Sequence, residues 1–387
     1  MAAGSKTTLP DEELTDEEQR VVERAAAWAA SDVAPLAEDW ERERRFAREA
    51  FDSAAAAGLT GLIVPSSDDG AGIGQVALAR VLEEIAAVDF GVAFSLVCHN
   101  NLAGAVSRAD DGPLRREVLP GLVDGSLVGA FLLTEPLVGS DAATITTAAA
   151  RDGDEWVLDG AKAWVTNGSA ADVMSVYAQT DPSLGHRGIA TFLVDADSPG
   201  VVHRDAYELF GGHSMGTTGV EFDGCRVPAD RLFVEPGRGF AAAMEGIDLA
   251  RVLVSAMSCG MLGVGLATAV ALTQERQAFG GRLADLQGVR FKLADVATDL
   301  EAARMLTYRA ARALQNGEQA GVAAAHAKKF ATRVTESRLA DCMQVMGAQG
   351  ARRDHPLPRH LSASRLTHYL DGATEIQDVV ISRALLD

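Results

Sequence analysis

The chain has 387 residues, of which 48% are apolar and 23% charged, so we expect two or three domains that fold without metals or disulfides. Lys and Arg number 35 against 54 Asp and Glu, and the resulting net charge of −19 disfavours binding to nucleic acid or to an anionic membrane surface. Residues 1–15 lack the basic start and apolar run of a signal peptide, and no apolar stretch of about 18 residues occurs, so we expect a soluble, cytoplasmic protein.

The residues from 16 to about 125 are rich in Ala, Leu, Val, Glu and Arg, and Gly and Pro turns interrupt them. This composition predicts an N-terminal helical domain over 1–126. Between 127 and 235, short β-forming runs alternate with Asp-Gly and Gly-rich turns, which predicts a β domain. The predicted strands are 130–134, 156–158, 173–178, 189–194 and 219–222.

A helical pattern returns over 236–387, which predicts a third, helical domain and an α+β multidomain fold. We expect helices over about 239–279, 283–316 and 319–346, then a loop, then a last helix over 376–386. One long apolar face follows spacings of three and four: Leu286, Val289, Leu293, Val296, Leu300 and Ala303. Small residues inside the first of these helices, such as Gly260, indicate close helix packing.

The four cysteines show none of the spacings of zinc sites or disulfide frameworks, so we expect thiols and no metal. They are Cys98, Cys225, Cys259 and Cys342.

Residues 212–216 read G-H-S-M-G and match the G-x-S-x-G pattern of serine hydrolases, which makes Ser214 a candidate nucleophile. That nucleophile requires a strand that ends in a sharp turn and opens directly into a helix. Here residues 217–222 have the composition of a strand. We therefore expect a loop at Ser214 and keep a serine hydrolase as an alternative.

Two segments of the predicted β domain end strands with distinctive side chains. Residues 132–141 read L-L-T-E-P-L-V-G-S-D and end a strand in a hydroxyl-bearing turn. Residues 160–168 read G-A-K-A-W-V-T-N-G and end another strand with an aromatic ring and a threonine. Together they predict hydrogen-bond donors and a stacking ring at one rim of the β domain.

Three further segments follow in order: 274–280 reads Q-E-R-Q-A-F-G, 344–347 reads Q-V-M-G, and 371–377 reads D-G-A-T-E-I-Q. With these five segments, from about residue 15 to the C-terminus, the chain resembles the flavin-dependent acyl-CoA dehydrogenase family. The family patterns are L-T-E-P-x-x-G-S-D, G-x-K-x-W-I-T-N, R-x-x-F-G, Q-x-x-G-G and E-G-T-x-x-I-Q. One such pattern alone is weak, whereas five in a fixed order are specific.

The resemblance implies an N-terminal helical domain over 1–126, a middle β barrel over 127–235 and a C-terminal four-helix bundle over 236–387. This order agrees with the α, β, α composition found independently. The resemblance also implies FAD as cofactor and an acyl-CoA or acyl-carrier-protein thioester as substrate. It further implies electron-transfer flavoprotein or oxygen as electron acceptor and a homotetramer or homodimer.

The resemblance implies flavin contacts position by position. The segment from Phe131 to Ser140 lies along the flavin in the family, and Trp164 and Thr166 match the residues that flank the ring and its N5 atom. Arg276, Phe279 and Gln287 match positions that hold the FAD of a neighbouring subunit. The remaining implied cofactor residues are Leu133, Thr134, Gly139, Gln344, Gly347, Ala348, Ala373 and Glu375. Two plainer interpretations stay open, namely Trp164 as a core aromatic residue and Arg276 as a solvated charge.

The substrate and the base are implied in the same way. Desaturation of a thioester needs a base for the proton on Cα, donors for the developing enolate and a flavin that accepts hydride from Cβ. The family's base is the Glu of E-G-T, and its place is taken here by Asp371, whose pKa burial should raise. The implied substrate-pocket residues are Ser140, Asp248, Arg251, Leu370 and Gly372.

Several positions depart from the family patterns, mainly near the base and the substrate entrance. Ala373 replaces the Thr of E-G-T, Asp378 replaces the Arg after I-Q, and Ala348 replaces the second Gly of Q-x-x-G-G. A specialised acyl group therefore stays as open as an ordinary fatty acyl-CoA. Two further alternatives are a nitroalkane-oxidase-like flavoenzyme, a branch that uses Asp as base, and a catalytically inert subunit with or without flavin.

Overall fold

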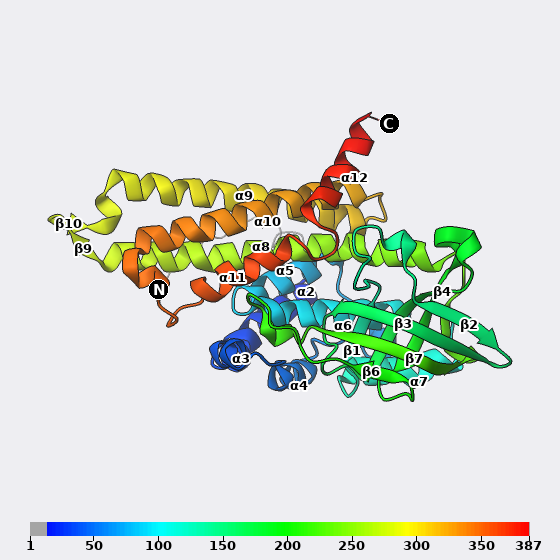
Figure 1. The fold of residues 1–387 in the computed structure, drawn as a ribbon. Helices are drawn as coiled ribbons and strands as arrows, with labels where there is room; N and C mark the ends of the chain where they lie inside the picture. The colour runs from blue at the N-terminus through cyan, green and yellow to red at the C-terminus, as the bar shows by residue number, and fades with distance from the viewer. Residues whose placement is uncertain (1–13, 387) are drawn as a thin grey trace.

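The structure is a computed structural model that describes residues 14–386. The segment on which the expectation of an untargeted protein rests, and the start of the predicted first domain, lie outside the described residues. In Figure 1 the chain forms a helical N-terminal part, a β-sheet domain at one end of the molecule, and long C-terminal helices that run along the top of the view.

The N-terminal part starts with a capping box, in which Thr15 Oγ1 accepts a hydrogen bond from the N–H of Glu18 at 3.2 Å. Pro113 starts its last helix and Gly125, in the left-handed conformation, ends it. The helices are α2 Asp16–Trp28, α3 Ala37–Glu43, α4 Arg48–Ala56, α5 Gln75–Ala86, α6 Phe90–Ser107 and α7 Pro113–Asp124. Helix α6 is buried on most of its circumference, so it forms the centre of this domain.

The β domain is one mixed sheet in the order β6-β7-β3-β2-β4-β5-β8, and β1 pairs in parallel with β4. Its core is the continuous set of inward-facing apolar side chains around Leu158, Val176 and Phe192. The strands are β1 Gly129–Leu132, β2 Ala148–Asp152, β3 Glu155–Val165, β4 Val173–Gln179, β5 Ile189–Asp195, β6 Val201–His203, β7 Thr218–Pro228 and β8 Leu232–Val234.

The C-terminal part contains α8 Gly239–Glu275, the hairpin β9 Gln277–Ala278 with β10 Gly281–Arg282, α9 Gln287–Gln315, α10 Gly321–Met346, α11 Leu357–Thr367 and α12 Thr374–Leu386. Helix α8 is long and apolar enough to cross a membrane, but most of its apolar stretch is buried inside the protein, as in a central core helix. A Cβ atom on Gly260 would lie 2.1 Å from the carbonyl oxygen of Glu83 in α5, so glycine is required where α8 and α5 touch. The predicted close helix packing at Gly260 is thereby confirmed.

The predicted fold class, with helical, β-sheet and helical domains in that order, is confirmed. One element was predicted wrongly, because residues 357–367 were expected in a loop and form α11. The buried face of this helix carries His360, Ser364 and Thr367, which are all fully buried. Polar side chains on the buried face leave no apolar period in the sequence, and the hydrophobic pattern therefore missed the helix.

Candidate active site

The two flavin motifs of the β domain lie side by side. The N–H of Ala163 donates a hydrogen bond to the carbonyl of Thr134 at 2.9 Å. Lys162 Nζ donates to the carbonyl of Leu133 at 3.0 Å. The segment after β1 and the end of β3 therefore form one rim, as the sequence predicts.

A buried ion pair fixes this rim. Lys162 Nζ lies 2.9 Å from Glu135 Oε1, and the same carboxylate accepts hydrogen bonds from the N–H and hydroxyl groups of Thr146 and Thr147. Burial opposes the charge on Glu135, but Lys162 and these donors lower its pKa to about 2. Burial lowers the pKa of Lys162 to about 8, with Glu135 opposing the shift, so both groups are charged at neutral pH.

The predicted stacking ring stands at the surface of this rim. Trp164 has a φ of 60° and is 59% exposed, and its ring centroid lies 4.8 Å from that of Tyr207. A bulky residue in the left-handed region is strained, which is typical of a functional position. The core-aromatic interpretation of Trp164 is therefore wrong. Two residues later, Thr166 is buried, and its side chain lies near the thiol of Cys98 in α6.

The rest of the first motif runs from the core to the surface. Phe131 packs against Tyr177 with ring centroids 4.9 Å apart, and Leu133 is buried. Gly139 and Ser140 lie exposed in the loop after β1. The segment can thus present backbone and hydroxyl groups to a ligand along the rim, although its flavin contacts remain a prediction.

The predicted base lies in the loop between α11 and α12. Asp371 and Gly372 have φ angles of 52° and 92°, so the chain reverses sharply here. Asp371 Oδ2 is enclosed, and no described residue donates a hydrogen bond to it. Burial raises the pKa of this carboxyl group to about 6, while Lys328 and Arg251 oppose the shift. A carboxylate with this environment is suited to accept a proton near neutral pH.

Helix α8 contacts this loop through Arg251. Arg251 Nε donates to the carbonyl of Asp371 at 3.0 Å, and Arg251 Nη1 pairs with Asp248 Oδ1 at 2.8 Å. Burial raises the pKa of Asp248, with Arg251 opposing the shift. Of the two predicted substrate residues of α8, Arg251 therefore holds the base loop and Asp248 holds Arg251, while their contact with substrate stays a prediction.

Cys98 connects the two halves of the site. Burial and the negative charge of Asp371 raise the pKa of its thiol, although the hydrogen bond with Thr166 opposes the shift. The thiol is therefore neutral, and both the candidate base and the threonine of the second motif act on it. Sequence reasoning assigned Cys98 no role, because nothing in its spacing connects it to either partner.

The remaining residues of the base loop have different surroundings. Leu370 and Ala373 are half-buried, while Glu375 is exposed in the first turn of α12. The carbonyl of Gly372 accepts hydrogen bonds from Lys328 Nζ at 2.6 Å and from Gln377 Nε2 at 2.9 Å. The sequence signalled Lys328 only as a lysine on the buried face of α10, four residues from Ala324 and from Thr332, which are both buried.

A second group of predicted residues forms a separate pocket of about 600 Å³ at the β9–β10 end of the helices. Arg276, Phe279, Gln344 and Gly347 line it. Arg276 Nη1 donates to the carbonyl of Met346 at 3.1 Å, but the residue is exposed, so the solvated-charge interpretation stays open.

Two further predicted residues, Gln287 and Ala348, lie close in sequence to residues that line this pocket. Both are exposed, and neither lines the pocket. Gln344 follows Lys328 by sixteen residues on the same helix, a separation of ~24 Å. Within one subunit, Trp164, Thr166 and Asp371 therefore belong to one region of the fold. The Arg276 pocket lies far from this region.

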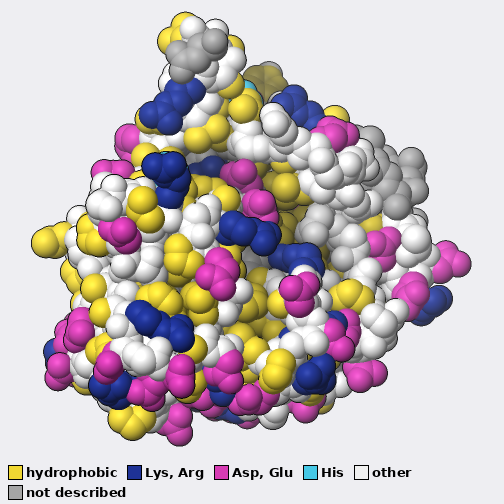
Figure 2. All heavy atoms as spheres, turned by 90° about the vertical axis from the view of Figure 1, so that its right-hand side faces the viewer, with side chains coloured by type: hydrophobic (Ala, Val, Ile, Leu, Met, Phe, Trp, Pro, Cys, Tyr) yellow, Lys and Arg dark blue, Asp and Glu magenta, His cyan; other side chains and the backbone are white. Residues whose placement is uncertain are grey.

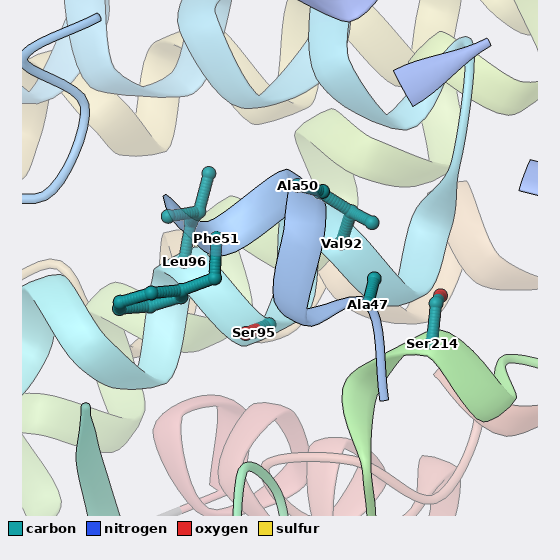
Figure 3. Close-up of a pocket in the computed structure, with 7 residues that line it drawn as sticks. All are labelled: Ala47, Ala50, Phe51, Val92, Ser95, Leu96 and Ser214. Atoms are coloured by element: carbon teal, nitrogen blue, oxygen red, sulfur yellow. The ribbon is translucent and has the colours of Figure 1, made fainter. Parts of the chain in front are cut away.

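Ser214 lies in a closed part of the protein. It belongs to a short 3₁₀ turn that leads into β7, and its hydroxyl donates to Asp89 Oδ1 at 2.5 Å. Figure 3 shows Ser214 beside Ala47 and Val92, in a cavity that has no room for a water molecule. No strand opens into a helix at this point, so the predicted loop is confirmed and the nucleophile elbow is absent at Ser214.

Among residues 14–386, no group of three His, Cys, Asp or Glu side chains could hold a metal ion, and all four cysteines are free.

Figure 2 shows the end of the molecule with the sheet. A hollow near the middle of this face has mostly hydrophobic walls, and Lys, Arg, Asp and Glu side chains surround its mouth. The fold and the site together define a three-domain enzyme with an enclosed carboxylate oxygen on the loop between α11 and α12.

Comparisons with known proteins agree with this class. The acyl-CoA dehydrogenase N-terminal, middle and C-terminal domain models match residues 15–126, 130–225 and 237–386. The chain is 35% identical over 376 residues to the probable acyl-CoA dehydrogenase FadE25 of Mycobacterium tuberculosis, and the match covers 96% of both chains.

Three solved structures are also similar to this chain. Butyryl-CoA dehydrogenase from Megasphaera elsdenii has a TM-score of 0.93, with 33% identity and coverage of 97% of this chain and 99% of that one. A chain in the structure of the electron transferring flavoprotein of Acidaminococcus fermentans gives 0.93, with 34% identity and 96% and 98% coverage. The FAD complex of PigA gives 0.91, with 25% identity and 96% and 98% coverage.

The chain belongs to the acyl-CoA dehydrogenase family. The predicted activity, dehydrogenation of an acyl thioester by an oxidoreductase that acts on CH–CH groups, is confirmed at the level of the family. The serine-hydrolase alternative is wrong.

Proposed function

We propose that the protein binds FAD non-covalently and desaturates a short-chain acyl-CoA between Cα and Cβ. The observation that carries this proposal is the enclosed carboxylate of Asp371, which has no hydrogen-bond donor among the described residues and faces Cys98 beside Thr166. The similarity to butyryl-CoA dehydrogenase supports the short acyl chain.

The residues at the rim fit a flavin. Trp164 offers an exposed aromatic face, Thr166 offers a hydroxyl group beside it, and the segment that ends at Thr134 offers backbone groups. When bound, FAD would accept the hydride from Cβ of the substrate. The FAD complex of the similar protein PigA supports the same cofactor here.

Asp371 would take the proton from Cα. With a pKa of about 6 the carboxyl group is mostly ionised at neutral pH, yet it is a stronger base than an ordinary aspartate. Arg251 holds the carbonyl of the same residue, which fixes the loop that carries the base.

We also propose a homo-oligomer in which the Arg276 pocket holds the FAD of a neighbouring subunit. The separation of ~24 Å between this pocket and the base loop, measured along α10, supports a contribution to a second site. A dimer or tetramer that dissociates when Arg276→Gln loses FAD would support this part. A monomer that holds FAD tightly would contradict it.

The proposal is tested by anaerobic stopped-flow with purified FAD-loaded protein. Short, long and branched acyl groups are supplied both as CoA thioesters and on a phosphopantetheinylated carrier protein, and bleaching of the flavin is followed. Bleaching by short acyl-CoA supports the proposal, and bleaching only by the carrier-bound form would replace CoA with a carrier protein. Protein that retains no FAD would favour an inert subunit, and bleaching by nitroalkanes alone would favour the nitroalkane-oxidase-like alternative.

The electron acceptor is proposed to be electron-transfer flavoprotein. The similarity to the chain in the Acidaminococcus fermentans structure supports this partner. The substrate-reduced enzyme should be reoxidised faster by electron-transfer flavoprotein than by air-saturated buffer. Faster reoxidation by oxygen would make the protein an oxidase.

A further inference from the structure

Lys328 of α10 is a buried cation beneath the base loop. Its side chain is among the largest that are fully buried, with 1% of the residue exposed. Among the described residues, Nζ has one hydrogen-bond partner, the carbonyl of Gly372 at 2.6 Å, and it forms no ion pair within 4.0 Å. A buried lysine without a paired carboxylate is costly, because burial disfavours its charge.

Three side chains converge on two neighbouring carbonyl groups of this loop. Lys328 and Gln377 both donate to the carbonyl of Gly372, at 2.6 and 2.9 Å. Arg251 donates to the carbonyl of Asp371 at 3.0 Å. Because these two residues have left-handed φ angles, the donors hold a backbone conformation that an aspartate rarely adopts.

Titratable groups from every packed element surround this loop. Arg251 and Asp248 come from α8, Cys98 comes from α6, and Glu375 comes from α12. His368, at the end of α11, hydrogen-bonds Thr374 Oγ1 at 3.1 Å and lies 3.1 Å from Glu336 of α10. Lys328 and Arg251 are the two cations that act directly on the carboxylate of Asp371.

We propose that Lys328 is a positioning residue for the proton transfer, whose buried charge keeps the carboxylate of Asp371 ionised while its hydrogen bond to Gly372 holds the loop in place. This inference rests on the proposed function of Asp371 as base. Lys328 touches neither the substrate nor the cofactor in this role.

The two contributions of Lys328 are physically separable. Its hydrogen bond restrains the backbone, and a displacement of the base by ~1 Å costs on the order of 10²-fold in rate at every pH. Its charge favours the ionised carboxylate, so loss of the charge raises the pKa of Asp371 and moves the acidic limb of the rate profile to higher pH. A neutral donor in a purely structural role would supply only the first contribution.

The experiment measures flavin reduction by the thioester in anaerobic stopped-flow between pH 5 and 9, with FAD content and melting temperature as folding checks. Lys328→Met removes both charge and donor, and we expect a plateau rate lower by roughly 10- to 100-fold and an acidic limb shifted up by roughly one pH unit. Lys328→Gln should recover part of the plateau but keep the shifted limb. Gln377→Leu, which removes only a neutral donor, should lower the plateau and leave the limb in place.

The matched control is Lys329→Met, the next residue of α10, which is more exposed and pairs with Asp378. Its plateau and limb should equal those of the wild type. An α-deuterated substrate should give a larger isotope effect in Lys328→Met than in the wild type, because proton abstraction becomes slower.

The proposal would be overturned if Lys328→Met kept both the plateau rate and the acidic limb of the wild type. It would also be overturned if the acidic limb of the pH–rate profile stayed at its wild-type pH in Lys328→Gln. Loss of FAD from both Lys328 variants would assign the lysine to folding of the bundle and would equally overturn it. Failure of the proposed function is recognised separately, because wild-type protein would then hold no FAD or would not be reduced by any thioester.

Discussion

Replacing Asp371 with Asn should abolish turnover and at the same time stabilise the protein at neutral pH. The substitution removes the only ionisable group of the side chain and keeps its size. Because Oδ2 accepts no hydrogen bond from the described residues, an amide at this position leaves no donor of the protein unpaired. Loss of a general base lowers a rate by roughly 10²- to 10⁴-fold.

The effect on stability follows from the pKa of the carboxyl group. Burial raises this pKa from 3.8 to about 6, with Lys328 and Arg251 opposing the shift. A raised pKa in the folded state means that the stability contributed by the group is complete below pH 3.8 and is lost as the pH rises through about 6. At about 1.4 kcal/mol per unit, the ionised carboxylate costs about 3 kcal/mol above pH 6.

The assay compares the thermal unfolding of wild type and Asp371→Asn from pH 4 to pH 8, with FAD content and stopped-flow reduction measured in parallel. The variant should unfold at about the same temperature as the wild type near pH 4 and several degrees higher above pH 6.5. Asp378→Asn changes an exposed carboxylate on α12 and serves as the control. Its unfolding temperature should not differ from that of the wild type in this pH-dependent way. The assignment of Asp371 would be refuted if Asp371→Asn and wild type differed in unfolding temperature by the same amount at pH 4 and pH 8. Flavin reduction by Asp371→Asn at the wild-type rate would also refute it.

Four other substitutions test residues outside the base loop. Lys162→Met leaves Glu135 buried and unpaired, so we expect a loss of about 3–5 kcal/mol in urea unfolding and weaker FAD retention. Gly260→Ala should cost ~1–3 kcal/mol, because its Cβ would lie 2.1 Å from a backbone oxygen of α5. Gly246→Ala, in the same helix but with open space around it, should gain about 0.5–1 kcal/mol, and equal effects of the two alanines would contradict the packing argument. Ser214→Ala should keep activity within a few fold in steady-state assays, whereas labelling of Ser214 by a fluorophosphonate would contradict its burial.

The fold was predictable where the sequence carries a repeating physical signal. The five predicted strand runs fall within β1, β3, β4, β5 and β7 or extend past an end by one or two residues, because their side chains are buried and β-branched or aromatic. Short strands with exposed or small residues, such as β2 and β6, carry no such signal and were not predicted. Helix α11 was missed because three of its five buried residues are polar, so its position depends in part on tertiary hydrogen bonds such as the one between His360 and the carbonyl of Ala87.

The candidate site was predictable only where its residues belong to contiguous motifs. Asp371, Trp164 and Thr166 stand in such motifs, and the resemblance therefore led to them directly. Lys328 is 44 residues from the carbonyl that it binds, and Cys98 belongs to a different domain from Thr166 and from Asp371. Contacts of this kind arise from packing of α6, α8 and α10 around one loop, which no local pattern encodes.

The surroundings of Asp371 combine two opposing requirements. The carboxylate must be basic enough to take a proton from carbon, which burial favours, yet it must be ionised before the substrate arrives, which the cations of α8 and α10 favour. With a pKa of about 6, about ten carboxylates are ionised for each protonated one at pH 7. An aspartate also reaches one methylene less far than the family's glutamate, so the backbone must bring it forward. The left-handed φ of 52° at Asp371 and the hydrogen bonds to the loop carbonyls fix the position of this proposed base, and ionisation of its buried carboxyl group lowers the stability of the fold at neutral pH.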